Sequence, residues 1–188
     1  MGRVAFFDES VRVRNPGVYV LALVSVSARD APHARRSLEA MLLPGQRRLH
    51  WRDESAERRS EILSLLEALG LHGSAYLALL TRGGRQSRAR ALCLEAALWD
   101  LRNARISEAV IESRGAQDRL DRSTILHAQK AGIADEGLSY RFARPTNEPM
   151  LWAADAIAGA FSSLESRESA TFEAIATRIA VPKHVEDR

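Results

Sequence analysis

The stretch Val4-Ala5-Phe6-Phe7-Asp8-Glu9-Ser10 places two adjacent carboxylates directly after four apolar residues. The apolar run predicts a buried strand, expected over residues 3–8. Burying a carboxylate is costly unless a cation or hydrogen-bond donors offset its desolvation. Carboxylates at a strand end favour hard divalent ions such as Mg²⁺, which take oxygen ligands and keep coordination positions for water and phosphate. The stretch therefore predicts a metal site and favours phosphodiester chemistry.

Apolar runs and helical periodicities alternate along the rest of the chain. Strands are predicted at residues 18–27, 73–80, 109–112 and 138–143, and helices at residues 31–42, 54–69, 87–104, 118–131 and 149–164. A further helix is expected after residue 167. The turn Asn15-Pro16-Gly17 predicts that the first two strands form an antiparallel hairpin. The two helices after this hairpin are interpreted as an arginine-rich insertion over about residues 29–70.

The order of these elements predicts the fold class. Antiparallel strands followed by helix, strand, helix, strand and helix indicate an α/β protein with a ribonuclease H-like mixed sheet flanked by helices, and with a helical insertion between the second and third strands. The chain has 188 residues, 46% of them hydrophobic, which is enough to bury one core. We expect residues 1–167 to form this domain and residues 168–188 to form a C-terminal helix or tail.

Cysteine count and hydropathy exclude several classes of protein. Cys93 is the single cysteine, so an intrachain disulfide and a cysteine-histidine zinc site are both excluded. The N-terminus lacks the pattern of a signal peptide, and no apolar run is long enough to cross a bilayer. We therefore expect a soluble protein in the reduced cytoplasm, without a membrane partner.

Basic residues suggest a nucleic-acid partner. The formal net charge is only +3, but Lys130 and Lys183 are the only lysines and every other basic chain is arginine, whose planar fork suits phosphate. A genome biased toward arginine codons would give the same composition, so the clustering of arginines is the more useful signal. The residues expected to contact nucleic acid are Arg47, Arg48, Arg52, Arg85, Arg88 and Arg114.

The first strand supplies the first candidate ligand. Side chains alternate between the faces of a strand, so Asp8 and Glu9 cannot both point into one site unless the strand ends or bulges between them. We expect Asp8 to be the metal ligand. Glu9 is expected to support the site, either by capping a turn, by pairing with an arginine, or by reaching the site from the strand terminus.

Three further acids are candidate ligands. Glu112 ends the strand predicted at residues 109–112, and open sheets usually bind ligands at the carboxyl ends of their strands. Asp118 follows closely and is kept as an extra ligand, with capping of the next helix as the structural alternative. Asp155 interrupts the apolar face of the helix predicted at residues 149–164, so a cation is expected beside it, either a metal ion or an arginine.

Glu95 and His50 complete the candidate site. Glu95 interrupts an apolar face of the helix predicted at residues 87–104 and is preferred as a ligand over Asp100, whose neighbours are smaller and more polar. Exposure, or pairing with an arginine of the same helix, is its structural alternative. His50 lies among arginines and is a candidate to move a proton or contact the scissile phosphate, although a loop histidine is commonly structural.

The same residues carry a resemblance to a known family. Its motifs here are Phe7-Asp8-Glu9-Ser10, Leu49-His50, Val110-Ile111-Glu112-Ser113-Arg114 and the helical stretch Leu151 to Ala160. They resemble a widespread bacterial family of uncharacterised ribonuclease H-like proteins, the domain of unknown function DUF3800, over about residues 3–162. The resemblance implies a divalent-metal nuclease fold. The chain departs from the family pattern at Val11, where glycine is common, and at Glu112, where aspartate is frequent.

Together these features predict a metal-dependent nuclease. Asp8, Glu112, Asp155 and Glu95 are expected to hold two Mg²⁺ or Mn²⁺ ions about 4 Å apart, one activating water and the other stabilising the leaving oxygen. The substrate, DNA or RNA, is left open, as are a homo-oligomer and a larger complex. The alternative is a catalytically weak or inactive nucleic-acid-binding or assembly subunit of a phage-defence or mobile-element system. Phosphatase chemistry with Asp8 as nucleophile ranks last, because Ser10 replaces the second aspartate that it needs.

Overall fold

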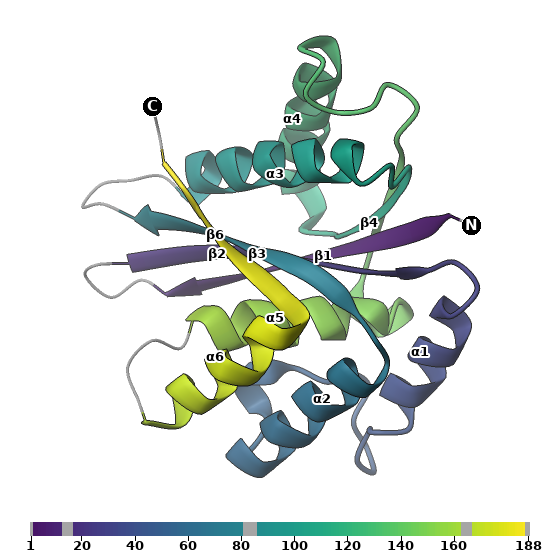
Figure 1. The fold of residues 1–188 in the computed structure, drawn as a ribbon, viewed down its shortest axis with the longest axis vertical. Helices are drawn as coiled ribbons and strands as arrows, with labels where there is room; N and C mark the ends of the chain where they lie inside the picture. The colour runs from purple at the N-terminus through teal and green to yellow at the C-terminus, as the bar shows by residue number, and fades with distance from the viewer. Residues whose placement is uncertain (1, 13–16, 81–85, 163–166, 187–188) are drawn as a thin grey trace.

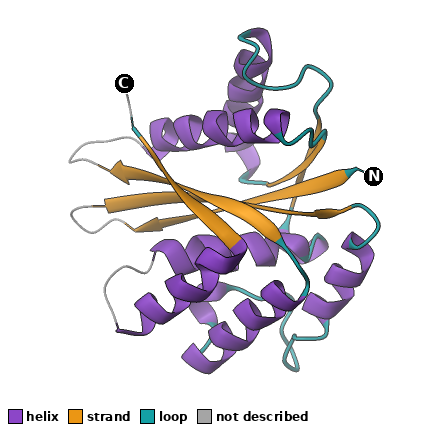
Figure 2. Cartoon of the chain, in the orientation of Figure 1, coloured by secondary structure: helices purple, strands orange, loops and turns teal. Residues whose placement is uncertain are grey.

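The described part of the chain forms a single sheet covered by helices on both faces. The computed structural model describes residues 2–12, 17–80, 86–162 and 167–186. Within these ranges the sheet has six strands in the order β5-β4-β1-β2-β3-β6. Helices α3 and α4 cover one face, and α1, α2, α5 and α6 cover the other (Figure 1, Figure 2). None of the described helices is long and apolar enough to cross a membrane.

The helices and strands follow one another along the chain in the expected order. The strands are β1 (Arg3–Arg12), β2 (Gly17–Ser27), β3 (His72–Leu80), β4 (Glu108–Glu112), β5 (Ser139–Ala143) and β6 (Ala180–Val185). The α-helices are α1 (Ala31–Glu39), α2 (Ala56–Ala68), α3 (Gln86–Asn103), α4 (Asp118–Lys130), α5 (Met150–Ser162) and α6 (Arg167–Ile179). Three short 3₁₀ turns are η1 (Trp51–Asp53), η2 (Gly115–Gln117) and η3 (Pro145–Asn147).

Strand pairing confirms the predicted mixed sheet. β1 pairs antiparallel with β2, and β2 pairs antiparallel with β3. The pairs β1–β4, β4–β5 and β3–β6 are parallel. The predicted antiparallel hairpin is therefore confirmed, while Asn15 and Pro16 of its predicted turn lie outside the described residues.

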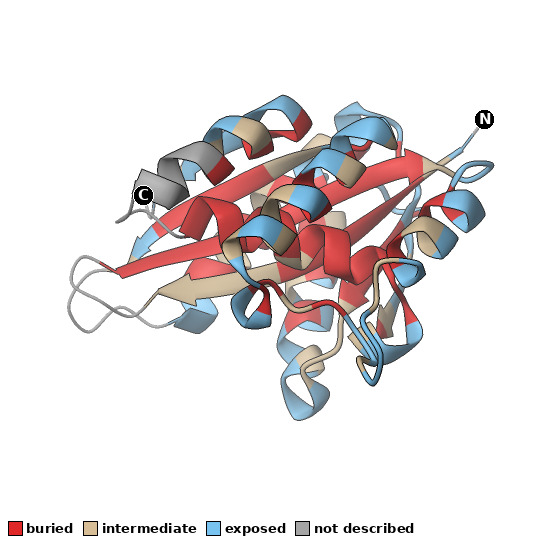
Figure 3. Cartoon of the chain, turned by 90° about the horizontal axis from the view of Figure 1, so that it is seen from below, coloured by how far each residue is buried: buried red, intermediate tan, exposed pale blue. Residues whose placement is uncertain are grey.

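Alternation along β1 divides the core into two layers. Val4 and Phe6 pack in the layer beneath α5, whereas Ala5 and Phe7 pack in the layer beneath α3. Helix α5 is rich in alanine and is buried on nearly all sides, which is why it lies flat against the sheet and is itself covered by the other helices of its face (Figure 3). A polar side chain on α5 therefore faces protein rather than bulk solvent.

Two features differ from the predicted elements. β1 does not end at Asp8 but continues to Arg12, because its last residues pair with the start of β2, as in Ser10 with Val20. Asp8 and Glu9 both lie within regular pairing, so no break or bulge separates them. The C-terminal tail forms the expected helix α6 and also β6, a strand that was not predicted because Pro182 interrupts its short pattern.

Candidate active site

Sheet register brings two of the predicted acids together. Phe7 and Ile111 are the last paired residues of the parallel strands β1 and β4. Asp8 and Glu112 follow them directly and share the sheet face beneath α5, since Phe6 and Val110, two residues before each, belong to that layer. Asp8 and Glu112 line the same cavity, and Glu112 is close enough to raise the pKa of Asp8.

Asp155 completes the acidic group from the covering helix. α5 packs on the same face of the sheet, and Asp155 lines a cavity of about 500 Å³ together with Asp8 and Glu112. This acidic cluster, defined as Asp8, Glu112 and Asp155, joins three of the four ligands expected from the sequence. The three residues come from parts of the chain far apart in sequence.

Burial makes the charge of Asp8 costly. Asp8 is only 6% exposed. Burial raises the pKa of its carboxyl group well above the usual value, and the hydrogen bond and charge of Glu112 and the charge of Asp155 raise it further. The backbone N–H of Glu9 donates to Asp8 Oδ1 at 2.6 Å and opposes this rise. A bound cation would relieve the repulsion among these carboxylates.

Asp155 is positioned by the turn η1. The backbone N–H of Trp51 donates to Asp155 Oδ2 at 2.8 Å. The Trp51 indole lies against Gly159, one helical turn further along α5, so closely that a Cβ at Gly159 would stand 2.2 Å from Trp51 Cδ1. Burial raises the pKa of Asp155, while the N–H of Trp51 and the charges of His50 and Arg48 lower it. Glycine at position 159 therefore allows the approach that fixes Asp155.

His50 lies at the edge of the acidic cluster. Its Nδ1 is 3.8 Å from Asp155 Oδ2, and the ring lines the same cavity. The backbone N–H of Arg52 donates to Nδ1 at 3.3 Å, so in the neutral ring the proton resides on Nε2. His50 thus lies beside the predicted acids, and its Nδ1 accepts a hydrogen bond within the turn η1.

The acidic cluster suits a hard divalent cation in its chemistry. Three carboxylates on one cavity are the oxygen donors that Mg²⁺ and Mn²⁺ prefer. Within residues 2–12, 17–80, 86–162 and 167–186, no three Asp, Glu, His or Cys side chains already stand close enough to enclose a metal ion. Binding a cation would therefore require these carboxylates to rearrange around it.

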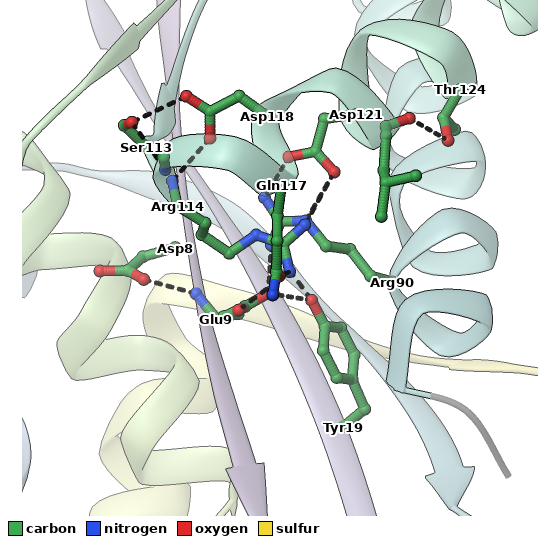
Figure 4. Close-up of polar contacts among 12 residues, drawn as sticks. Asp8, Glu9, Tyr19, Arg90, Ser113, Arg114, Gln117, Asp118, Asp121 and Thr124 are labelled. Carbon is green, nitrogen blue, oxygen red and sulfur yellow. Dashed lines mark hydrogen bonds and ion pairs between the residues drawn. The ribbon is translucent and has the colours of Figure 1, made fainter.

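Glu9 points to the opposite face of the sheet. Tyr19 Oη–H and the Arg90 guanidinium donate to Glu9 Oε2, and Arg114 lies 3.6 Å from Oε1 (Figure 4). Arg90 also holds Asp121 through two hydrogen bonds of 2.8 and 2.7 Å. Glu9 thus adopts one of its expected supporting roles, pairing with arginine.

Glu95 is not brought to the acidic cluster. It lines a separate cavity of about 820 Å³, beside Tyr76, Asp100 and Lys183. Helix α3 packs on the face of the sheet that Phe7 occupies, whereas Asp8 and Glu112 face α5. This placement corrects the expectation that Glu95 is a fourth ligand.

The predicted nucleic-acid contacts divide into two groups. Arg48 and Arg52 are exposed and line the cavity of the acidic cluster, and the exposed Arg47 directly precedes Arg48 in the chain. Arg88 is exposed near the start of α3, on the other helical layer. Arg85 lies outside the described residues.

Arg114 and Asp118 serve the loop after β4. Arg114 donates to Asp121 at 3.1 Å and to Gln117 at 2.9 Å, so its guanidinium is engaged in bonds within the protein. This arrangement corrects the expectation that Arg114 contacts a phosphate. Asp118 accepts from Ser113 Oγ at 2.7 Å and from the backbone N–H of Arg114 at 2.6 Å. Asp118 therefore holds the loop that precedes α4, does not cap this helix, and does not line the cavity of the acidic cluster.

Several cavity residues were missed by sequence reasoning. Trp51 and Arg59 line the cavity, and Arg59 donates to the Trp51 carbonyl at 2.9 Å. Ser10 Oγ and Ser162 Oγ lie 2.8 Å apart on its wall. The available signal was Gly159, since glycine inside an alanine-rich helix indicates close approach of another group. The identity of that group depends on tertiary packing.

The architecture is that of the ribonuclease H-like class. The chain is similar to the solved structure of ribonuclease H2 from Pyrococcus horikoshii, with a TM-score of 0.60 and 17% identity, covering 92% of this chain and 76% of that one. It is also similar to ribonuclease HII in its complex with PCNA from Archaeoglobus fulgidus, with a TM-score of 0.56 and 19% identity, covering 85% and 71%. At these identities the similarity shows the fold alone. No protein-family model and no curated protein matches the sequence.

Proposed function

We propose that the chain is a divalent-metal-dependent nuclease that hydrolyses phosphodiester bonds of DNA or RNA. The observation that carries this proposal is the acidic cluster, in which two sheet residues and one helix residue place three carboxylates on one cavity. The ribonuclease H-like fold and the resemblance of the Asp8-Glu9-Ser10 and Asp155 motifs to the DUF3800-like family support it.

The cation would be held by Asp8, Glu112 and Asp155. Once bound, Mg²⁺ or Mn²⁺ would supply Lewis-acid polarisation of the phosphodiester and a more acidic water. Burial and the neighbouring carboxylates raise the pKa of Asp8, so a bound cation would favour its ionised form. The backbone N–H of Trp51 donates to Oδ2 of Asp155 and would hold this carboxylate in place beside the cation.

The cationic rim of the cavity would bind the substrate. Arg48 and Arg52 are exposed and line the cavity, where they offset the charge of a phosphodiester. His50 Nε2 is the ring nitrogen that could carry a proton to a leaving oxygen, since Nδ1 accepts from Arg52 and the ring lines the cavity. In this assignment the acidic cluster performs the hydrolysis, and the arginines of the rim bind the nucleic-acid strand.

A second candidate function is nucleic-acid binding without cleavage. The arrangement of the carboxylates favours it, because among the described residues no three Asp, Glu, His or Cys side chains are already placed to hold a metal ion. Glu112 is also one methylene longer than the aspartate frequent in the resembled family. This candidate predicts binding that is independent of divalent metal.

The test is cleavage of labelled single-stranded, duplex and hybrid substrates with Mg²⁺, with Mn²⁺ and with a chelator. Wild type is compared with Asp8→Asn, Glu112→Gln and Asp155→Asn, and Glu95→Gln is the matched control outside the cluster. We expect metal-dependent cleavage by wild type and by Glu95→Gln, and a loss of at least 100-fold in the cluster variants. Equal cleavage by all five proteins refutes the proposal, and binding without cleavage by wild type favours the second candidate.

A further inference from the structure

Basic residues also lie beyond the cavity, at the β5 edge of the sheet. Ala143 pairs with Glu112 in the β4–β5 register, so Arg144 emerges beside the end of the strand that carries a cluster carboxylate. The next residue, Pro145, lines the cavity of the acidic cluster. Arg144 is exposed. The basic surface at the β5 edge of the sheet is therefore adjacent to the rim of the cavity.

Helix α4 extends this basic character along the edge. Arg119 and Arg122 are exposed and lie three positions apart, which places them on one side of the helix. The acids of the same helical turns bond within the protein. Asp118 accepts from the backbone N–H of Arg114 in the loop after β4, and the buried Asp121 pairs with Arg90. The outer side of α4 therefore presents cations without the compensating carboxylates of its own sequence.

One contact holds Arg122 of α4 against the end of β5. The Arg122 guanidinium lies over the Phe142 ring, 4.8 Å from its centre. A guanidinium stacked on a ring keeps its N–H groups at the rim available to phosphate. β5 is at the edge of the described sheet, so this contact places Arg122 beside the outer strand that leads to Arg144.

The acids near this surface are already paired or distant. Glu148 is buried and bonded to Arg35 and Arg141. Glu108 lies at the opposite end of β4 from Glu112. Within the residues that the structure describes, Arg119, Arg122 and Arg144 form no ion pair. These three side chains keep their full charge for a ligand.

We propose that Arg119, Arg122 and Arg144, here called the β5-edge surface, bind the phosphodiester backbone of a nucleic acid outside the cavity. The inference rests on the proposed function and adds the path of the substrate. With Arg48 and Arg52 on the rim and the β5-edge surface extending from the Pro145 side, a bound strand passes the acidic cluster and continues over β5 and α4. Affinity then depends on substrate length, because a short strand reaches only the cavity.

The test compares two charge-reversal variants of equal charge change. Arg119→Glu/Arg144→Glu removes two contacts of the β5-edge surface and leaves the Arg122 stack intact. Arg29→Glu/Arg36→Glu changes two exposed arginines around the start and end of α1 and is the control. Thermal unfolding and size-exclusion chromatography establish that each variant is folded and report its oligomeric state.

Binding is measured with a chelator present, using labelled single strands of about 6 and about 30 nucleotides across a salt series. We expect the β5-edge variant to bind the long strand at least tenfold more weakly, and the slope of log affinity against log salt to fall by about 1.4 for two lost contacts to a single strand. Its affinity for the short strand should change much less. The control variant should match wild type on both.

Three outcomes overturn the proposal. Long-strand affinity and salt slope equal to wild type show that the surface does not bind the backbone. Oligomerisation of the variant at unchanged affinity shows that the arginines instead protect an edge strand from pairing. Loss for both strand lengths shows a general charge effect. Because binding is measured without metal, absence of cleavage by wild type would refute the proposed catalysis and leave this result standing.

Discussion

Asp8 and Glu112 lie on neighbouring parallel strands, each one residue beyond the last β1–β4 pair, and both line the cavity that Asp155 also lines. Burial and the neighbouring carboxylates of Glu112 and Asp155 raise the pKa of Asp8. The ionisation of Asp8 therefore contributes to the stability of the metal-free protein and to its affinity for a cation.

Stability of the metal-free protein should fall as pH rises. The pKa of Asp8 is raised in the folded state, so the folded protein binds more protons than the unfolded chain at pH values between the ordinary pKa, about 4, and the raised one. Stability from this group is present at low pH and is lost through that window. Urea unfolding across pH in a chelator, for wild type and Asp8→Asn, measures the effect. A wild-type minus variant difference that does not change with pH contradicts it.

Divalent cations should stabilise the folded protein. A cation that binds only the folded state at 100 times its Kd adds about 2.7 kcal/mol. Thermal unfolding with Mn²⁺ and with a chelator should therefore show a higher Tm for wild type and for Glu95→Gln with Mn²⁺, but little change for Asp8→Asn and Asp155→Asn. A similar shift in all four proteins would show that Mn²⁺ binds elsewhere.

Gly159→Ala should impair activity through Trp51. The new Cβ would stand 2.2 Å from Trp51 Cδ1, so the indole must move, and we expect the backbone of Trp51, whose N–H donates to Asp155, to shift with it. We expect a destabilisation of about 1–3 kcal/mol and at least a tenfold loss of kcat. A double-mutant cycle with Trp51→Ala separates this contact from general packing. Strictly additive effects would show that the two residues do not interact.

Arg90→Ala should destabilise the protein strongly. The side chain is 4% exposed and balances Glu9 and the buried Asp121, so its removal leaves these two carboxylates to share Arg114. We expect a loss of about 3–5 kcal/mol in chemical unfolding. Arg178→Ala, at an exposed pair with Glu67, is the comparison and should cost under about 1 kcal/mol. Equal losses for both variants would contradict the assignment.

Cys93 should resist modification in the native state. Burial raises the pKa of its thiol to about 12, so almost no thiolate exists near pH 8. Labelling by an aromatic disulfide reagent should be at least 100-fold slower in the folded protein than in denaturant. Fast native labelling would show that this part of α3 opens readily.

Local patterns predicted the fold and most of the acidic cluster. Val4 to Phe7 and Ala109 to Ile111 are apolar runs whose ends carry acids, and parallel pairing brings such ends together. The prediction that Glu95 is a ligand was wrong because its helical neighbours show that one face of the helix is buried, but they do not show which side of the sheet the helix covers. Trp51 was missed because its role depends on packing against Gly159, about a hundred residues away in the chain.

The pairing of Glu9 with Arg90 has a consequence for the other side of the sheet. Glu9 faces the α3 layer, yet its backbone N–H donates to Asp8, whose side chain faces α5. Successive side chains of β1 face opposite layers at this position, and the peptide unit between Asp8 and Glu9 connects the two layers. A disturbance of the Arg90 network would therefore reach the acidic cluster through a single peptide unit, without passing through the cavity.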